Sequence, residues 1–357
     1  MSEQDLSQTL QAQVQAAYAS STALTIQSGN SKAWHGNPTQ GAALRLAEHS
    51  GILNYEPSEL VITARAGTRL TELETVLAAE HQCLAFEPPH FGATATLGGT
   101  IACNFSGSAR PYLGAARDFV LGCKLINGRG EILQFGGQVM KNVAGYDVSR
   151  LMAGALGTLG VLLEVSLRVL PKPETELTLV KELTASAAIQ QANAYARLAL
   201  PMTGFAQFEG RAYLRLAGTA GAVQQAKAII GGEELPEGAS FWFNLREQQL
   251  EFFQSQQNLW RLSVPADTTV LELGGSTLYD WGGAQRWLFS DSEAANIRAA
   301  VTSVGGHATL FRQAQQTQLT ASRFQPLATE LLRYHRQLKQ AFDPKGIFNP
   351  NRLYLGL

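Results

Sequence analysis

Charge is scarce in this chain, and neither sign dominates. Charged residues make up 16% of the 357 residues, whereas a typical soluble domain has roughly 25%. The 28 basic and 29 acidic residues give a net charge of −1, so the chain lacks the basic surface that nucleic acids attract. No basic cluster precedes an apolar helix, which argues against direct anchoring to anionic lipid. We expect a surface with so little charge to be partly covered by a cofactor or a partner subunit.

Cysteine is equally scarce, with three residues at Cys83, Cys103 and Cys123. An odd number without a Cys-x-x-Cys pair argues against a disulfide framework, a zinc site and an iron–sulfur cluster. Free cysteine is among the most buried residue types. The pattern therefore predicts three small buried side chains in a reducing cytoplasm.

Segments for secretion or membrane insertion are not evident. The first six residues contain neither the basic nor the apolar stretch of a secretory signal. No apolar run reaches the roughly 18 residues that a membrane-spanning helix requires. These features predict a cytoplasmic chain that reaches a membrane only through a partner subunit.

The length predicts about two domains. Pro171-Lys172-Pro173 is the clearest boundary, because this Pro-x-Pro segment ends a strand-like run. Before it, helices are expected at residues 6–20 and 71–80, the second capped by Thr71 with Glu74 completing a capping box. Asn127-Gly128 predicts a hairpin turn. Strands are expected at residues 24–27, 53–55, 60–64, 119–126, 131–135 and 160–170.

Beyond the boundary, strands and helices interleave with hairpin links. This order predicts an antiparallel sheet with helices on one face. The last helix is expected within residues 324–342. The other predicted helices are residues 185–198, 220–230 and 292–304, and the predicted strands are residues 177–183, 204–209, 211–216, 260–264, 269–273, 286–288 and 308–312.

Glycine and small polar residues concentrate in three segments. The turn Gln27-Ser28-Gly29-Asn30-Ser31-Lys32 offers backbone N–H groups that can hold a diphosphate, although an ordinary tight turn explains it as well. Gly98-Gly99 permits close approach of the backbone to a ligand and opens a polar loop that is expected to extend to residue 107. The third segment holds Gly145-Tyr146-Asp147 and Gly157-Thr158-Leu159-Gly160-Val161. No Rossmann or Walker signature occurs, so nicotinamide or ATP binding through those folds is not indicated.

These motifs resemble those of the vanillyl-alcohol-oxidase superfamily, also called PCMH-type FAD-binding proteins. The resemblance includes the C-terminal run Phe342-Asp343-Pro344-Lys345-Gly346-Ile347-Phe348-Asn349-Pro350. The resemblance implies an α+β fold with a two-subdomain FAD-binding domain at residues 1–172. It also implies a smaller antiparallel sheet-plus-helix cap domain at residues 173–312. A C-terminal helix and tail, residues 313–357, would return to the FAD-binding domain.

The same resemblance implies which residues contact FAD. In that family, loops matching Ser28–Lys32 and Leu97–Gly107 wrap the pyrophosphate. The first loop has no histidine or cysteine, so non-covalent binding is expected, and His35 is expected at the surface. The implied FAD-binding residues are Gln27, Ser28, Gly29, Asn30, Ser31, Lys32, Pro88, Thr96, Leu97, Gly98, Gly99, Ala102, Asn104, Ser106, Gly107, Arg110, Gly145, Tyr146, Asp147, Gly157, Leu159, Gly160, Val161 and Asn349.

Three further runs narrow the resemblance: Glu87-Pro88-Pro89, residues 135–147 and residues 305–310. They are similar to the FAD-binding subunits of bacterial glycolate oxidase, also called glycolate dehydrogenase. That family implies a FAD-dependent oxidoreductase acting on CH–OH donors, which converts glycolate to glyoxylate. It implies partnership with a second FAD subunit and an iron–sulfur subunit at the cytoplasmic face of the inner membrane. The alternative is a non-catalytic assembly or electron-relay subunit whose partner flavoprotein oxidises the substrate.

Catalytic residues are harder to assign. Catalytic 2-hydroxyacid relatives carry a His-Gly-Asp-Gly-Asn-x-His run that binds a divalent metal. This chain lacks that run, and none of its six histidines are spaced four apart, so no metal site of that type is expected.

Oxidation of a 2-hydroxy acid requires a base for the hydroxyl proton and a cation for the carboxylate. His307 and Arg312 are the candidates, with Arg323 a weaker cation, and a turn histidine beside a solvated strand arginine is the alternative interpretation. Tyr146 and Asp147 are expected to position a backbone loop.

Overall fold

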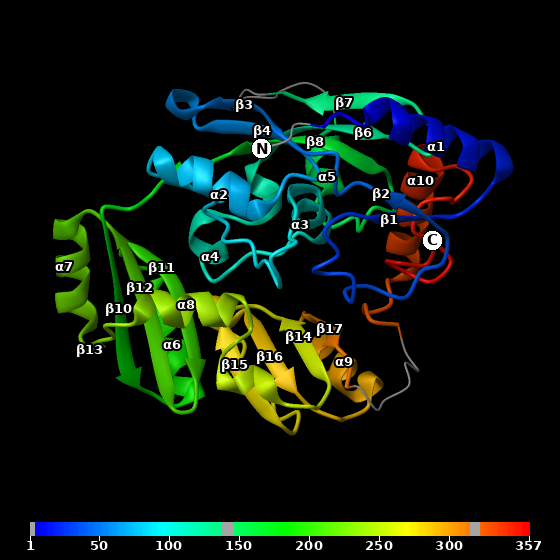
Figure 1. Cartoon of the computed structure of the whole chain (residues 1–357). Coiled ribbons are helices and arrows are strands. Elements are labelled where there is room, and N and C mark those ends of the chain that lie inside the picture. The colour runs from blue at the N-terminus through cyan, green and yellow to red at the C-terminus, as the bar shows by residue number, and fades with distance from the viewer. Residues whose placement is uncertain (1–3, 138–145, 315–321) are drawn as a thin grey trace. The chain divides into compact units, whose positions relative to one another are not determined.

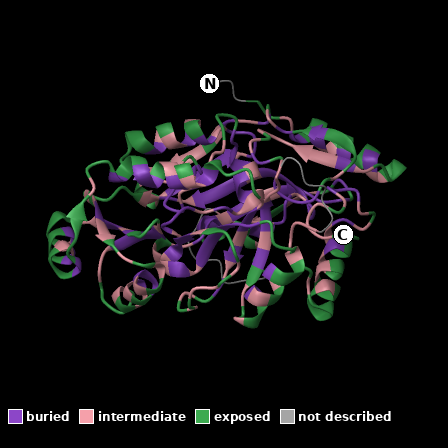
Figure 2. Cartoon of the chain, turned by 90° about the horizontal axis from the view of Figure 1, so that it is seen from below, coloured by how far each residue is buried: buried purple, intermediate pink, exposed green. Residues whose placement is uncertain are grey.

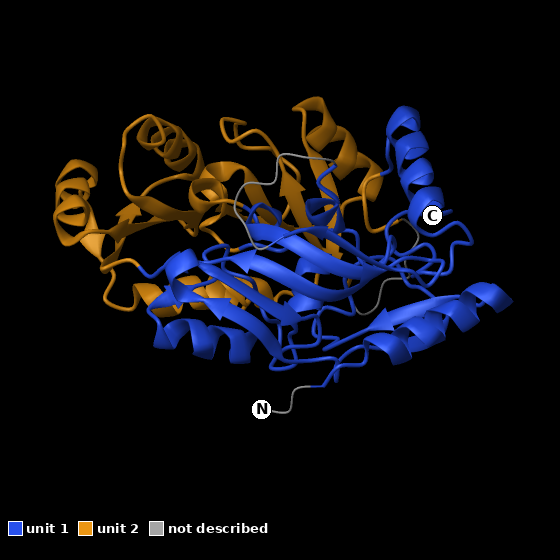
Figure 3. Cartoon of the chain, turned by 90° about the horizontal axis from the view of Figure 1, so that it is seen from above, with its two compact units in different colours: residues 1–106, 115–172, 326–357 blue, residues 107–114, 173–325 orange. Residues whose placement is uncertain are grey.

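The computed structural model describes residues 4–137, 146–314 and 322–357. Its contacts divide the chain into two compact units (Figure 3). Unit 1 comprises Met1–Ser106, Ala115–Lys172 and Pro326–Leu357, and unit 2 comprises Gly107–Gly114 and Pro173–Gln325. None of the described helices has the length and apolar character needed to cross a bilayer.

Unit 1 is built on a five-stranded antiparallel sheet with the order β3–β4–β8–β6–β7 (Figure 1). The Asn127-Gly128 turn joins β6 to β7 as predicted, and Asn127 Oδ1 accepts hydrogen bonds from the backbone N–H groups of Arg129 and Glu131. These bonds satisfy donors that the turn leaves unpaired. The strands are β3 (Ile52–Glu56), β4 (Val61–Arg65), β6 (Val120–Ile126), β7 (Ile132–Gly136) and β8 (Val161–Arg168).

Two smaller sheets complete unit 1. One is a parallel pair formed by β1 (Leu24–Gln27) and β2 (Ala42–Arg45), and β1 is followed by the turn at Ser28. The antiparallel pair joins β5 (Gln82–Cys83) to β9 (Leu170–Pro171). The sequence did not predict β2, because three of its four residues are exposed and its apolar pattern is weak.

Several helices of unit 1 differ from expectation, and α5 was not predicted from the sequence. α2 begins at Leu70 with Arg69 as its N-cap and no side-chain cap, so the predicted Thr71 cap is wrong. The segment expected to be a loop from Leu97 starts with helix α3, because Thr96 caps it by accepting a hydrogen bond from the N–H of Gly99. The helices are α1 (Ser7–Ser20), α2 (Leu70–Ala79), α3 (Leu97–Cys103), α5 (Val148–Met152) and α10 (Thr329–Phe342), with short 3-10 turns at Pro57–Glu59 and Ala116–Phe119.

The core of unit 1 lies around β8, the central strand. Leu163, Val165 and Leu167 have no solvent exposure and belong to one apolar cluster with residues of α1, α2 and α3. Figure 2 shows the buried strands in purple and the exposed helix faces in green. Burial of this many aliphatic side chains supplies the main stabilising free energy, at about 25 cal/mol per Å² of apolar surface.

The C-terminal tail, residues 343–357, is fixed to unit 1 by a buried ion pair. Lys339 Nζ donates to Asp343 Oδ2 at 2.8 Å and to the carbonyls of Thr158 and Phe348. The Asp343 carboxylate also accepts from the N–H groups of Ile347 and Phe348. Because every donor of the buried ammonium has an acceptor, the pair avoids the penalty of an unsatisfied charge.

Unit 2 contains an eight-stranded sheet with the order β13–β10–β12–β11–β15–β16–β14–β17, and its pairings are antiparallel. Buried residues of α6 and α7 pack with β10–β12, and those of α9 pack with β14, β16 and β17. The strands are β10 (Thr175–Glu182), β11 (Met202–Phe208), β12 (Arg211–Gly218), β13 (Glu233–Glu234), β14 (Leu259–Ser263), β15 (Ser276–Asp280), β16 (Gln285–Phe289) and β17 (His307–Arg312). The helices are α4 (Arg110–Leu113), α6 (Ala185–Tyr195), α7 (Ala220–Ile230), α8 (Gly238–Arg246) and α9 (Ala294–Ser303), with 3-10 turns at Glu251–Gln254 and Trp281–Gly283.

One predicted strand of unit 2 is wrong. Residues 269–273 form no strand, and the neighbour of β16 is β15 further along the chain. The buried guanidinium of Arg286 donates to the carbonyls of Thr268 and Thr269. A side chain therefore satisfies the backbone acceptors that a β-ladder would otherwise have used.

Candidate functional site

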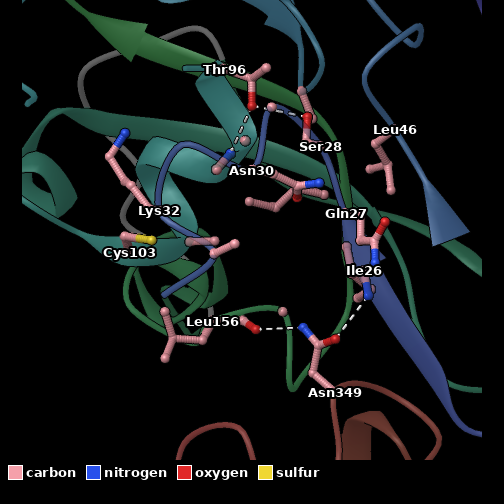
Figure 4. A pocket seen from close by; sticks show the side chains of 18 of the residues that line it. Ile26, Gln27, Ser28, Asn30, Lys32, Leu46, Thr96, Cys103, Leu156 and Asn349 are labelled. Carbon is pink, nitrogen blue, oxygen red and sulfur yellow. Dashed lines mark hydrogen bonds between the residues drawn. The ribbon is translucent and has the colours of Figure 1, made fainter. Parts of the chain in front are cut away.

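A cavity of about 210 Å³ lies in unit 1, where the turn after β1 meets α3, the 155–162 segment and the tail (Figure 4). It is lined by many of the residues predicted to bind the cofactor: Gln27, Ser28, Gly29, Asn30, Ser31, Lys32, Thr96, Gly98, Gly99, Ala102, Gly157, Gly160 and Asn349. The other lining residues, which sequence reasoning missed, are Thr25, Ile26, Ala33, Thr39, Leu46, Ala66, Cys103, Met152, Ala155, Leu156, Leu162 and Arg352.

The turn after β1 presents backbone donors to this cavity. Asn30 has a left-handed φ of 57°, and the N–H groups of Gly29, Asn30 and Ser31 have no acceptor among the described residues. A Cβ at position 29 would overlap the carbonyl oxygen of Thr94, so this approach requires glycine. Successive N–H groups in such a turn form a nest that binds anions.

Helix α3 also lines the cavity, and its N-cap residue Thr96 contacts the turn after β1. Thr96 Oγ1 donates to Ser28 Oγ at 3.0 Å (Figure 4). A Cβ at Gly98 would lie 2.6 Å from the Cβ of Ala66, so this glycine is required by packing. A Cβ at Gly99 would meet Thr96 Oγ1 at 3.2 Å and no other atom within 4 Å. The two adjacent glycines thus have different roles, because one permits packing and the other leaves the cavity open.

Asn349 closes the cavity from the tail. Its Oδ1 accepts from the N–H of Ile26 at 2.8 Å, and its Nδ2 donates to the carbonyl of Leu156 at 2.7 Å (Figure 4). Gly157 follows with a φ of +68°, and a Cβ there would lie 2.8 Å from Asn349 Nδ2. One amide side chain therefore joins the end of β1 to the 156–157 turn.

The charges around the cavity have one sign. Lys32 and Arg352 line it, whereas none of its lining residues is Asp or Glu. Lys32 Nζ donates to the carbonyl of His90 at 3.1 Å, and Arg352 donates to the carbonyls of Ala33 and Asn37. The acceptors in these bonds are neutral carbonyls, and a lining that carries positive charge attracts an anion.

Cys103 and His35 lie at or near this cavity. Burial raises the pKa of the Cys103 thiol to about 11, against the smaller opposing effects of Lys32 and Arg352. The thiol is therefore protonated at neutral pH and is a poor nucleophile. The expectation that His35 lies at the surface is wrong, because it is 6% exposed and its ring centroid lies 4.6 Å from that of Phe105.

Several predicted cofactor residues lie elsewhere in unit 1. Leu97 and Val161 are buried in the apolar core, and Pro88 is also buried. Leu159 lines a different cavity beside α10. These residues support the elements around the cavity and do not line it.

Others have local structural roles or fall outside unit 1. Asn104 Oδ1 accepts from Arg117 N–H, and Ser106 Oγ accepts from Ala116 N–H. Asp147 caps α5 through the N–H of Arg150, while Tyr146 is 96% exposed. Gly107 and Arg110 belong to unit 2, and Gly145 lies outside the described residues.

The two candidate catalytic residues lie at opposite ends of β17 in unit 2. His307 pairs with Ser263 and Arg312 with Leu259, and a strand rises about 3.3 Å per residue, so the strand does not bring them together. Burial, with a smaller effect from the charge of Arg261, lowers the pKa of His307. Arg312 is half-buried and donates to Gln248 Oε1 at 2.8 Å, and burial lowers its pKa.

Arg323, the weaker candidate cation, lies beside β17. Its carbonyl accepts a hydrogen bond from the N–H of Leu310, and burial lowers its pKa. Within the described ranges, no three His, Cys, Asp or Glu side chains are grouped to hold a metal ion.

Comparison with known proteins shows likeness to a family model and to individual proteins. A family model described as a FAD binding domain matches residues 6–136. The chain is 47% identical over 353 residues to "Glycolate oxidase subunit GlcE" of Escherichia coli (strain K12), and the match covers 99% of each chain. It is also 36% identical over 145 residues to "Glycolate oxidase subunit GlcD" of Bacillus subtilis (strain 168), covering 40% of this chain and 30% of that one.

The solved structures include a similar fold in alkyldihydroxyacetonephosphate synthase. The TM-score is 0.66 at 16% sequence identity, with 96% of this chain and 75% of that chain covered. Likeness at this identity concerns the fold alone. With the family model, it confirms the predicted α+β fold with a PCMH-type FAD-binding domain.

Proposed function

Because the chain belongs to the family of the glycolate oxidase subunit GlcE, we propose that it works in a complex that converts glycolate to glyoxylate and passes the electrons to a partner chain. Its cofactor is FAD, and it is an FAD-dependent oxidoreductase of the hydroxy-acid type. The observation that carries the proposal is the cavity of unit 1, where unpaired backbone donors and two cations converge without a carboxylate among the lining residues.

The cavity residues fit the diphosphate of FAD. The N–H groups of Gly29, Asn30 and Ser31 would donate to its oxygens, and the charges of Lys32 and Arg352 would offset its negative charge. Asn349 would keep the end of β1 and the 156–157 turn in place around the cofactor. When bound, the flavin accepts the two electrons that a hydroxy acid loses on oxidation.

We further propose that FAD binds non-covalently. The turn at residues 28–32 has no cysteine or histidine. Cys103, which lines the cavity, is half-buried, and desolvation raises the pKa of its thiol to about 11. A thiol that stays protonated does not provide the thiolate that covalent attachment to a flavin would require.

The partners in this proposal are a second FAD subunit and an iron–sulfur subunit. The names of the relatives, glycolate oxidase subunits GlcE and GlcD, support a complex of several chains. An iron–sulfur partner would take electrons onward, since this chain has no cysteine pattern for a cluster of its own. Attachment to the cytoplasmic face of the inner membrane would occur through such a partner.

A second candidate function is a non-catalytic assembly or electron-relay subunit. It is favoured by one sequence feature, the absence of the His-Gly-Asp-Gly-Asn-x-His run of catalytic 2-hydroxyacid relatives. In that case the partner flavoprotein would oxidise glycolate.

Anaerobic mixing of the isolated full-length chain with glycolate separates the two functions. Photoreduction of the same sample provides a positive control, because it shows that the flavin can accept electrons. Loss of the absorption band near about 450 nm on mixing supports direct oxidation by this chain. A flavin that photoreduction bleaches but glycolate does not would support the assembly or relay function.

A further inference from the structure

Three adjacent strands of unit 2 bring a row of polar side chains to one face of the sheet. Ser263 on β14 pairs with Gln285 on β16 and with His307 on β17. Arg261 lies two residues before Ser263 and therefore points to the same face. Diagonal neighbours on paired strands lie about 7–8 Å apart, so Arg261 is adjacent to both Gln285 and His307.

The opposite face of these strands is apolar. Trp260, Leu262 and Ala308 belong to a buried cluster with Ile297 and Val301 of α9. The polar row is thus separate from the side chains that hold α9 on the sheet, and it does not contribute to that core.

Arg261 differs from a neighbouring buried arginine in how its donors are used. Arg286 donates through all three nitrogens to backbone carbonyls, at Gly283, Thr268 and Thr269. Arg261 donates through Nε to Gln285 Oε1 at 2.7 Å. Neither of its Nη groups has an acceptor, and it forms no ion pair, within the described part of the chain.

The surroundings of Arg261 carry excess positive charge. Arg110 and Arg261 both lie over the ring of Trp281, with centroid distances of 4.4 and 5.2 Å. Asp280 is the nearby carboxylate, and its oxygens accept from Trp281 N–H and Gln285 Nε2. Burial lowers the pKa of Arg261 to about 10, and the charge of Arg110 adds to this effect. Two guanidiniums near one carboxylate leave a partly buried charge that an anion would offset.

We propose that Arg261 binds the carboxylate of a small 2-hydroxy acid through its Nη groups, with Gln285 orienting the guanidinium and His307 facing the substrate hydroxyl. This inference rests on the proposed function and names the cation of its substrate site. It replaces the pairing of His307 with Arg312 that the sequence suggested. The backbone of His307 belongs to the β14–β17 ladder, but its imidazole ring has no hydrogen-bond partner among the described residues, so the ring is available to a ligand.

The test is the binding of oxalate, an unreactive dicarboxylate, to the isolated full-length chain, measured by calorimetry. Arg261→Gln should weaken oxalate binding about tenfold or more, since charge-assisted hydrogen bonds are lost. Arg261→Lys, which keeps the charge, should bind more tightly than Arg261→Gln. Arg211→Gln, at an exposed position of β12, is the matched control and should bind oxalate like the unaltered chain.

Several outcomes of these binding measurements would contradict the proposal. No binding of oxalate by the unaltered chain, or equal binding by Arg261→Gln, would overturn the proposal. A loss on Arg312→Gln but not on Arg261→Gln would restore the pairing suggested by the sequence. In each variant the flavin absorption is recorded as well, because loss of flavin tests the cofactor site in unit 1 and not the carboxylate site. In the assembled complex, Arg261→Gln should raise the KM for glycolate about tenfold, whereas Arg211→Gln should not.

Discussion

The variant Gly99→Ala is expected to affect FAD binding and the stability of unit 1 in opposite directions. The added methyl group would touch Thr96 Oγ1 at 3.2 Å and otherwise extend into the cavity. Because alanine is the better helix former, the apo-chain should gain up to about 0.5–1 kcal/mol of stability. If FAD occupies this space, overpacking should cost its binding about 1–3 kcal/mol, which is about a 5- to 150-fold increase in Kd.

The assay is a titration of apo-chain with FAD, followed by quenching of flavin fluorescence, together with thermal unfolding of the apo-chain. Gly221→Ala is the matched control. It lies in α7 of unit 2, and a Cβ there would meet no atom within 4 Å. If Gly99→Ala binds FAD as tightly as Gly221→Ala does, the cofactor does not occupy the space beside α3 and the reasoning is refuted.

Three further predictions concern Lys339 of α10, Asn349 of the tail and His49. Lys339→Met should lower the free energy of unfolding by about 3–5 kcal/mol, because it leaves the buried carboxylate of Asp343 without a counter-charge, and chemical denaturation measures the loss. Asn349→Asp should weaken FAD binding and cost about 1–3 kcal/mol of stability, since the new carboxylate cannot donate to the carbonyl of Leu156; FAD titration and denaturation measure both. His49 is fully buried, its Nδ1 accepts from the backbone, and burial lowers its pKa below 6.5. The unfolded chain therefore takes up the proton first, and stability present above about pH 6.5 should fall as the pH is lowered below it; His49→Gln should flatten that dependence in unfolding measured from pH 5 to 8.

Each of these predictions has a contrary result. Lys345→Met changes an exposed lysine of the tail, and a Lys339→Met variant as stable as this control would contradict a stabilising role of the buried ion pair. Asn351→Asp keeps its role as acceptor for Gly356 N–H, so equal effects at residues 349 and 351 would mean that the bond to Leu156 is unimportant. A pH dependence that His49→Gln leaves unchanged would assign it to another group.

Elements set by local turn chemistry could be predicted from the sequence. The Asn127-Gly128 hairpin forms because the asparagine side chain satisfies turn donors within four residues. Helix α7 was predicted with its observed bounds, since Thr219 supplies a local cap by accepting from Ala222 N–H.

Elements that depend on partners distant in the sequence could not be predicted from the sequence. Residues 269–273 form no strand, and the carbonyl of Thr269 accepts a hydrogen bond from the side chain of Arg286, 17 residues along the chain. β2 has little apolar pattern and forms by pairing with β1. Helix α3 was missed because two adjacent glycines oppose a helix on propensity, and the tertiary contact of Gly98 with Ala66 makes glycine necessary there.

The residues that line the cavity of unit 1 also divide into those that a local motif indicates and those that tertiary folding brings there. The turn at residues 28–32 and the glycines of α3 could be found from their motif, because the backbone itself lines the cavity. The sequence does not indicate that Arg352, Cys103 and Leu156 line the cavity, since the folding of the tail and the packing of α3 bring them to it. In the proposed carboxylate site of unit 2, the register of β14 and β17 brings Arg261 near His307, and no local sequence pattern indicates that pairing.

The central claim is that unit 1 binds FAD non-covalently, and flavin analysis of the full-length chain produced without its partners tests it most directly. We expect absorption bands near about 370 and 450 nm, with about one FAD per chain that acid precipitation releases into the supernatant. A chain that remains colourless after incubation with FAD would contradict the claim of binding. A flavin that stays with the acid-precipitated protein would contradict the claim that the attachment is non-covalent.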